Sequence, residues 1–203
     1  MERFSSVIFS LIFIAGCAGR GPIVRHAEPF PVKIAVLPFS NLSVDMQGPL
    51  VIRNVLETRL AASQYELANS QDIDEKLKSL GITDGGQINA TTPQKLGLLL
   101  DTEALVYGEL VEFKNMNIGV YSNRVVEAKL KLVDAKTGQT IWEAQKKYSN
   151  KKFGLDKDAI RDNLVSGYAN KMLENILKNP LRQETEMVVA QLVKNLNKTR
   201  KNW

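Results

Sequence analysis

The apolar positions along the chain predict a sheet whose strands are interleaved with helices. Residues 32–37 form an apolar, β-branched run that ends at Pro38, which indicates a strand covered on both faces. Shorter apolar runs at 65–68 and 104–110 predict two further strands. Apolar and charged residues alternate from 125 to 133, as in a strand with one exposed face.

Helical periodicity occupies the segments between these strands. One helix is predicted to open at Pro49, because proline is favoured in a first turn. A second is predicted from Ser70, with acidic residues in its first turn and Gly81 at its end. A third is predicted from Thr91 to Leu100.

The resulting order, β-α-β-α-α-β-β-β, predicts the fold class. Helical crossovers place the first three strands parallel. Residues 134–138 indicate a turn and 139–148 a returning strand, so the last two strands form an antiparallel hairpin. We therefore predict an α/β domain, a three-layer mixed sheet with helices packed on it, plus C-terminal helices.

Two amphipathic helices are predicted after residue 150, separated at Pro180. The first carries the apolar stripe Leu155, Ala159, Ile160, Leu164, Tyr168, Met172 and Ile176, and the second carries Met187, Val188, Gln191, Leu192 and Leu196. Such stripes usually pack on their own domain. The alternative is a helix for a partner, or an interfacial helix with Trp203 and the basic end at a lipid surface.

The N-terminus has the pattern of a secretory signal. The apolar run 7–14 is too short for a bilayer span, which needs about 20 residues. The sequence Ile-Ala-Gly-Cys at 14–17 resembles the lipobox of bacterial lipoproteins, with Ile14 in place of the usual leucine. This resemblance implies cleavage between Gly16 and Cys17, a diacylglyceryl group on the Cys17 thiol, and acylation of the new amino group, commonly with palmitate.

Alternatives to the lipobox are an ordinary signal peptide with a chance cysteine, or a buried apolar helix. Two or more acyl chains hold a protein stably on a membrane, whereas one holds it marginally. In the best-studied sorting rule, Ala18 favours the outer membrane. The predicted location is therefore the outer membrane, lipid-anchored and facing the periplasm.

The predicted organisation has four parts. Residues 1–16 are the lipoprotein signal peptide, 17–31 a lipidated Gly/Pro-rich tether, 32–150 the α/β domain, and 151–203 a C-terminal helical extension. His26, the single histidine, lies in the tether and is expected to be a solvated linker residue.

Charge is concentrated in the C-terminal part of the chain. Residues 146–203 hold 13 Lys and Arg against 6 Asp and Glu, although the whole chain carries a formal charge of only +5. A basic segment can bind anionic lipid, an acidic partner or nucleic acid. The favoured interpretation is a solvated helix face, and no nucleic-acid motif accompanies it.

Catalytic and metal-binding chemistry finds little support. One cysteine and one histidine leave no Ser/His or Cys/His pair and no transition-metal ligand set. The glycines of 81–86 follow no strand and precede no Lys-Ser/Thr, so they indicate a plain loop. We expect no enzyme activity, cofactor or metal.

Two groups of acidic residues could in principle carry chemistry. Asp72, Asp74 and Glu75 have the composition of a hard-cation site but lack the calcium-loop spacing, so they are expected to face the helix dipole. Asp101 and Glu103 have the composition of an acid/base pair, and the alternative is two exposed residues at a strand entry.

Four stretches, 32–38, 81–96, 101–108 and 132–142, together with the lipobox, resemble one family. It is the family of periplasmic or outer-membrane lipoproteins that includes a neisserial surface vaccine antigen. More distant similarity is to CsgG, LpoB and the TolB N-terminal domain. The resemblance covers residues 30–148 and implies a non-catalytic three-layer α/β domain that acts in envelope assembly or export. Residues 111–121 are too short and mixed for a channel-forming hairpin, so no pore is expected.

These observations lead to three hypotheses for the function. The leading hypothesis is an outer-membrane-anchored, non-catalytic accessory or export-associated module that binds a periplasmic or outer-membrane protein, or a second copy of itself. The alternative is a small-ligand-binding or enzymatic envelope protein that uses the sheet's C-terminal edge. The third is a structural role in which the basic C-terminal helices hold anionic lipid or cell wall.

Overall fold

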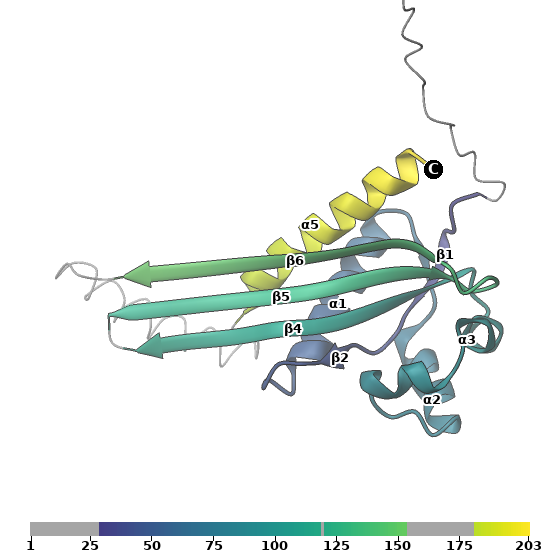
Figure 1. The fold of residues 1–203 in the computed structure, drawn as a ribbon, viewed down its shortest axis with the longest axis horizontal. Coiled ribbons are helices and arrows are strands. Elements are labelled where there is room, and N and C mark those ends of the chain that lie inside the picture. The colour runs from purple at the N-terminus through teal and green to yellow at the C-terminus, as the bar shows by residue number, and fades with distance from the viewer. Residues whose placement is uncertain (1–28, 119, 154–180) are drawn as a thin grey trace, which may run out of the picture.

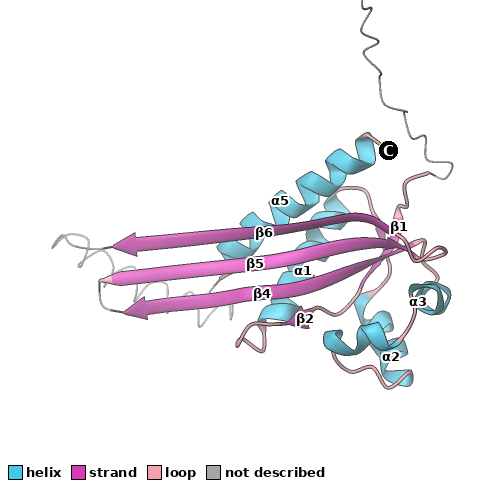
Figure 2. Ribbon diagram, in the orientation of Figure 1, coloured by secondary structure: helices cyan, strands magenta, loops and turns pink. Residues whose placement is uncertain are grey.

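The computed structural model describes residues 29–118, 120–153 and 181–203. Its sheet has six strands in the order β3-β1-β4-β5-β6, with β2 also paired to β4 (Figures 1 and 2). The strands are β1 (Lys33–Val36), β2 (Ser40–Asn41), β3 (Glu66–Leu67), β4 (Ala104–Ile118), β5 (Tyr121–Asp134) and β6 (Thr140–Phe153). The helices are α1 (Gly48–Ala62), α2 (Ser70–Ser79), α3 (Pro93–Leu100), α5 (Arg182–Lys201) and the 3₁₀-helix η1 (Gly85–Ala90).

The predicted strand directions are confirmed. β1 pairs in parallel with β3 and β4, because helices connect these strands. β4, β5 and β6 form a continuous antiparallel meander. The short β2, which pairs in parallel with β4, lies between the predicted strand 32–37 and the helix predicted from Pro49, where no strand was predicted.

The predicted three layers are also confirmed. α1 and α5 cover one face of the sheet, and α2, α3 and η1 cover the other (Figure 1). Alternate residues of β1 and the position after it enter the two cores: Ile34 and Val36 pack with α1 and α5, and Ala35 and Leu37 pack with α2 and α3. Burial on both faces explains why this strand is apolar throughout.

Helix boundaries follow local capping chemistry. α2 begins at Ser70, as predicted, and Asn69 is its N-cap, since the Asn69 side-chain oxygen accepts hydrogen bonds from the N–H groups of Gln71 and Asp72 at 2.8 and 3.2 Å. Gly81 follows the helix with φ +77°, as predicted for its end. The loop expected at 81–86 is in part the first turn of η1.

The last three strands are longer than the sequence predicted. β4 continues from residue 110 to Ile118, and β5 begins at Tyr121 rather than at residue 125. Pairing runs without a break in direction from Ala104↔Asp134 to Ile118↔Tyr121, with one irregularity after Leu110. Cross-strand hydrogen bonds, not an apolar face, hold this part together, so the period-two pattern is missing. β6 likewise extends to Phe153, and the boundary predicted at 150 falls inside a strand.

The C-terminal helix α5 packs diagonally on the domain, as the favoured interpretation expected (Figure 1). Val188, Leu192 and Leu196 are buried as predicted, but Met187 and Gln191 are exposed because the stripe is rotated towards Val189 and Val193. The first predicted helix, 155–176, lies outside the described residues. Within the described ranges no helix has the length and apolarity to cross a membrane.

Candidate functional site

The acids at the entry to β4 hold the edge of β1. The Glu103 carboxylate accepts hydrogen bonds from the backbone N–H groups of Val32 and Lys33 at 2.9 and 3.2 Å. The Lys33 ammonium donates to Asp101 at 2.5 Å, which holds the pKa of that carboxyl below its usual range. The two carboxylates therefore bind the chain itself rather than forming an acid/base pair.

Asp74 is committed to a structural ion pair. The Arg53 guanidinium is buried and donates to both Asp74 carboxylate oxygens at 2.8 and 2.9 Å. It also donates twice to the carbonyl oxygen of Val36, at 2.9 and 3.2 Å, and so links α1, α2 and β1. Across the described ranges, no group of three or more His, Cys, Asp or Glu side chains is placed to hold a metal ion.

The crevice at the C-terminal end of β1 is small. Its lining includes Ser40, Tyr107, Lys129 and Glu143, and its volume is about 170 Å³. Ligand pockets usually measure about 300–1,000 Å³. An ion pair of 2.5 Å between Lys129 and Glu143 crosses it. This geometry gives no support to the small-ligand alternative.

Gly85 beside this crevice serves packing. A Cβ atom built there would lie 2.2 Å from the backbone oxygen of Phe39, so only glycine allows η1 to approach the chain after β1. Of the glycines in 81–86, Gly85 thus serves a close backbone contact, whereas Gly81 has the positive φ of a helix end.

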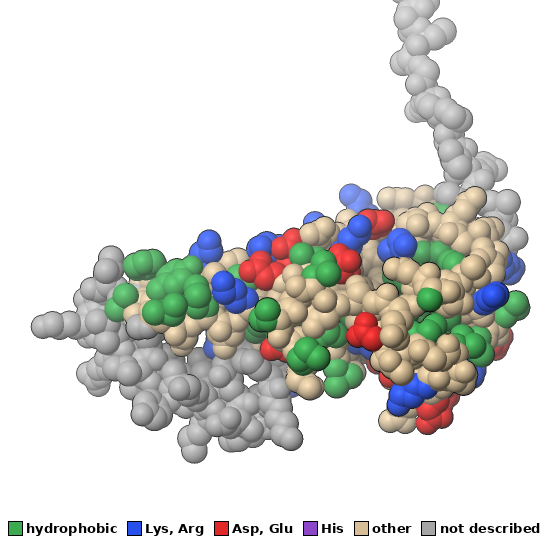
Figure 3. Space-filling view, turned by 60° about the horizontal axis from the view of Figure 1, so that its bottom comes forward, with side chains coloured by type: hydrophobic (Ala, Val, Ile, Leu, Met, Phe, Trp, Pro, Cys, Tyr) green, Lys and Arg blue, Asp and Glu red, His purple; other side chains and the backbone are tan. Residues whose placement is uncertain are grey.

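The distal halves of β4, β5 and β6 form a ribbon that projects beyond α1 and α5 (Figure 1). Apolar side chains gather at its end (Figure 3). Ile118 is 65% exposed, Val120 40% and Phe153 70%, and the Phe153 ring lies 5.3 Å from that of Tyr121. We call these four residues the ribbon tip.

Ion pairs between neighbouring strands connect the ribbon near its base. The Lys147 ammonium on β6 contacts Glu112 on β4 at 2.6 Å and Glu127 on β5 at 3.0 Å. Its hydrogen bond holds the pKa of Glu127 below the usual range. Three strands are thereby linked by one cation.

A second apolar group lies in the loop between β2 and α1. Leu42, Val44 and Met46 are 65%, 95% and 84% exposed. Hydrogen bonds from the Asn41 side chain to the Asp45 carbonyl and from Ser43 to Asn41 hold the loop in place.

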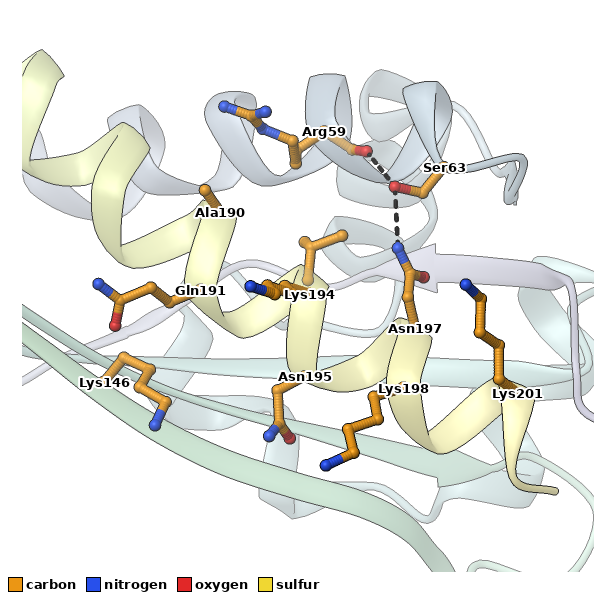
Figure 4. Close-up of a pocket in the computed structure, with 11 residues that line it drawn as sticks. Arg59, Ser63, Lys146, Ala190, Gln191, Lys194, Asn195, Asn197, Lys198 and Lys201 are labelled. Atoms are coloured by element: carbon orange, nitrogen blue, oxygen red, sulfur yellow. Dashed lines mark hydrogen bonds between the residues drawn. The ribbon is translucent and has the colours of Figure 1, made fainter.

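A basic groove of about 710 Å³ lies along α5, which covers the face of the sheet opposite α2 and α3. Figure 4 shows the residues that line it. Five cationic side chains from three elements line it, and no acidic side chain does. They are Arg59 of α1, Lys146 of β6, and Lys194, Lys198 and Lys201 of α5. We use the name basic groove for this set.

Polar contacts fix α5 beside α1 and β6. The Trp142 indole N–H donates to Asn195 at 2.8 Å, and the Asn197 amide donates to the Ser63 hydroxyl at 3.2 Å. The Ser63 hydroxyl in turn donates to the carbonyl oxygen of Arg59 at 3.0 Å, as Figure 4 shows. The basic side chains therefore project from a rigid frame.

The first described residues meet the end of α5. The Phe30 ring packs edge-on against Trp203, with ring centroids 5.4 Å apart. Arg200 lies over the Tyr65 ring at 4.9 Å. Phe30 thus lies at the C-terminal end of α5, the helix that carries Lys194, Lys198 and Lys201 of the basic groove. Gly16, Cys17 and His26 themselves lie outside the described residues.

Comparison with known proteins identifies the family. The profile of the GNA1162-like lipoprotein family matches residues 24–199 of this chain. The chain belongs to the GNA1162-like family. The family predicted from the sequence is thereby confirmed.

Relatives of this GNA1162-like chain include lipoprotein NMB1124/NMB1162 of Neisseria meningitidis serogroup B, with 28% identity over 115 residues. That alignment covers 57% of this chain and 54% of the relative, so the chain spans about half the relative's length. The crystal structure of lipoprotein GNA1162 from Neisseria meningitidis is 24% identical, with a TM-score of 0.56, and covers 71% of this chain and 99% of that one. It shows the shared fold.

Other solved structures are more remote. The C-terminal domain of LpoB from Salmonella enterica is 15% identical, with a TM-score of 0.43, and covers 58% of this chain and 83% of that one. The PelC dodecamer of Paraburkholderia phytofirmans is 14% identical, with a TM-score of 0.41, and covers 66% and 81%. The similarities to CsgG and TolB stay predictions.

Sequence reasoning about this GNA1162-like chain missed both exposed surfaces. The only advance signal for the groove was the charge excess after residue 146, which was assigned to solvated helix faces. The ribbon tip had no signal, because Ile118, Val120 and Phe153 lie in segments without a strand pattern.

Proposed function

We propose that this chain is an outer-membrane lipoprotein, anchored through acylated Cys17 and facing the periplasm. It serves there as a non-catalytic accessory module in envelope assembly or export. It binds a periplasmic or outer-membrane protein through the ribbon tip. Membership of a lipoprotein family and the lipobox at 14–17 support the anchor. The structural roles of Asp74, Asp101 and Glu103 support a module without catalysis.

The observation that carries the binding role is the exposure of large apolar side chains at the ribbon tip. Ile118 and Phe153 are 65% and 70% exposed at the end of a paired, rigid element. Fully burying such a side chain contributes about 1.5–3 kcal/mol, so covering the tip favours a complex by several kcal/mol. Apolar patches rimmed by polar residues mark interaction sites in soluble domains.

The strand edges of the ribbon support the same role. Among the described residues, the outer edge of β4 beyond Leu110 pairs with no strand. An extended segment of a partner can add to such an edge through main-chain hydrogen bonds. The other edge, β6, carries Lys146, Lys147, Lys151 and Lys152, and lysines discourage edge pairing. The open β4 edge and the apolar tip therefore favour a partner that approaches from the β4 side.

Photo-crosslinking in intact cells tests the binding role. A crosslinking amino acid at position 118 should yield a discrete adduct, whereas one at Leu98, which is 86% exposed on α3, should not. The double substitution Ile118→Ser and Phe153→Ser should abolish an adduct formed from position 116, and the matched Leu98→Ser should preserve it. Equal labelling from the tip and from position 98 would contradict the docking role.

Fractionation tests the anchor independently. The wild-type chain should sediment with outer membranes and carry lipid on Cys17 by mass spectrometry. A Cys17→Ala chain should lack that lipid and remain unprocessed. Normal processing of the Cys17→Ala chain would overturn the anchor.

A further inference from the structure

We infer that the basic groove along α5 binds the anionic phospholipid headgroups of the membrane that carries the anchor, and so sets the orientation of the domain. The inference rests on the proposed function in one respect, the attachment of the chain to that membrane. It adds a second, electrostatic contact that the anchor itself does not require.

The first argument is charge without internal compensation. Among the described residues, the five cations of the basic groove have no carboxylate partner, although lysines elsewhere do, as at Lys33, Lys129 and Lys147. Five such charges around one concavity create a positive potential that attracts anions. The groove therefore offers cations without carboxylate partners to an anionic ligand.

The second argument is the spacing of the cations. Lys194, Lys198 and Lys201 follow one another at i, i+4 and i+7 and so share one side of α5, while Val188, Leu192 and Leu196 occupy the side that faces the sheet. Lys146 and Arg59 flank this row from β6 and α1 (Figure 4). A row flanked on both sides offers several cations to a surface of many anions rather than one deep site to one ligand.

The third argument is position relative to the anchor. Phe30 packs on Trp203 at the end of α5, so the described part of the chain begins near the end of the row of lysines. The predicted tether keeps the domain within roughly 40 Å of its membrane. Anionic headgroups are thus held at high effective concentration next to the groove. This proximity favours a lipid surface over an acidic protein as the occupant.

The consequence is a defined orientation. The C-terminal end of α5, where Phe30 packs on Trp203, lies at the end of the domain far from the ribbon tip (Figure 1). Binding of headgroups by the basic groove therefore holds the C-terminal end of α5 at the anchoring membrane, with the ribbon tip at the other end of the domain. That orientation leaves the tip open to a partner.

Trp203 provides the measurement. The chain has two tryptophans, and Trp142 is only 6% exposed, so quenching by lipid reports mainly on Trp203. The full lipidated chain is reconstituted in phosphatidylcholine vesicles, with or without phosphatidylglycerol, that contain phosphatidylcholine with a nitroxide headgroup. Phosphatidylglycerol should increase the quenching, and about 1 M salt, where the screening length is about 3 Å, should remove the increase.

Matched charge variants assign the effect to the groove. The triple variant Lys194→Glu, Lys198→Glu and Lys201→Glu should lose the phosphatidylglycerol effect. The same three lysines replaced by Gln should lose it too, and this neutral variant keeps the test valid if the Glu variant fails to fold. Each lysine near an anionic surface favours the bound orientation by about fivefold, so three are sufficient for a full loss. The control Lys114→Glu, Lys151→Glu and Lys152→Glu changes the same charge on the exposed ribbon and should retain the effect.

Three results would overturn the inference. The first is equal Trp203 quenching in vesicles with and without phosphatidylglycerol. The second is an unchanged phosphatidylglycerol effect in both the Glu and the Gln variants of the groove. The third is loss of the effect in inorganic phosphate but not in chloride of equal ionic strength, which would indicate a site for a small anion. Two further variants distinguish failure of this inference from failure of the proposed function. The Ile118→Ser and Phe153→Ser chain should keep the lipid effect, and a chain without lipid on Cys17 should still sediment preferentially with phosphatidylglycerol vesicles.

Discussion

Substitution of Leu192 by alanine tests whether α5 belongs to the core or is a helix held for a partner or a lipid surface. Leu192 is fully buried and packs in the core formed by β1, β4, β5, β6 and α1. Shortening a buried leucine removes its transfer free energy and leaves a cavity, which together cost about 2–5 kcal/mol. For a chain of this length each kcal/mol lowers the melting temperature by about 2–4 °C. We therefore expect a melting temperature lower by roughly 4–20 °C.

The neighbouring residue supplies the control. Gln191 is exposed on the same turn of α5, so Gln191→Ala should change stability by less than about 0.5 kcal/mol. Unfolding is followed by tryptophan fluorescence. The Trp142 indole N–H is hydrogen-bonded to Asn195 of α5 and Trp203 follows the same helix, so the signal reports on the docking of this helix. If Leu192→Ala and Gln191→Ala melted together, the packing of α5 on the sheet would be refuted and the partner-helix alternative restored.

Three further outcomes test other contacts. Gly85→Ala should lower the unfolding free energy by about 1–3 kcal/mol in urea titrations, because its Cβ meets the Phe39 backbone, and wild-type stability would contradict that contact. Arg53→Met should lower the melting temperature by an amount equivalent to about 3–5 kcal/mol, since it leaves a buried carbonyl and a carboxylate without donors; an unchanged melt would refute that role. The Lys147 hydrogen bond lowers the pKa of Glu127, so its stabilisation is present above the ordinary glutamate pKa of about 4.3 and is lost as the pH falls through the lowered folded value. Glu127→Gln should flatten this acid loss in urea midpoints measured against pH, and an identical pH profile in the variant would argue against the pair.

The core of the domain was predictable from local pattern. β1 enters two cores at once, and its uninterrupted apolar sequence signals that burial directly. Pro49, Gly81 and Pro93 mark helix ends because their backbone restrictions act at single positions. Helical connections between the early strands then required parallel pairing.

The distal parts of β4, β5 and β6 could not be predicted from such local patterns. Asn115 and Asn117 are poor strand formers, yet they pair with Arg124 and Ser122 across β5. Their strand conformation depends on hydrogen bonds to a neighbour that the local sequence does not specify. The same limitation placed the end of the α/β domain at residue 150, three residues before β6 ends.

The amino-acid sequence by itself determined the lipobox, the element order and the layered α/β class, because each depends on residues adjacent along the chain. Only the tertiary structure decided that Arg59, Lys146 and Lys198 surround one groove, and that the tip of three strands is apolar and open. The physical reason is distance along the chain: the potential at the groove and the exposure at the tip arise from side chains brought together by packing of α5 and pairing of β4 to β6. A charge excess or an isolated phenylalanine acquires its meaning only from those neighbours.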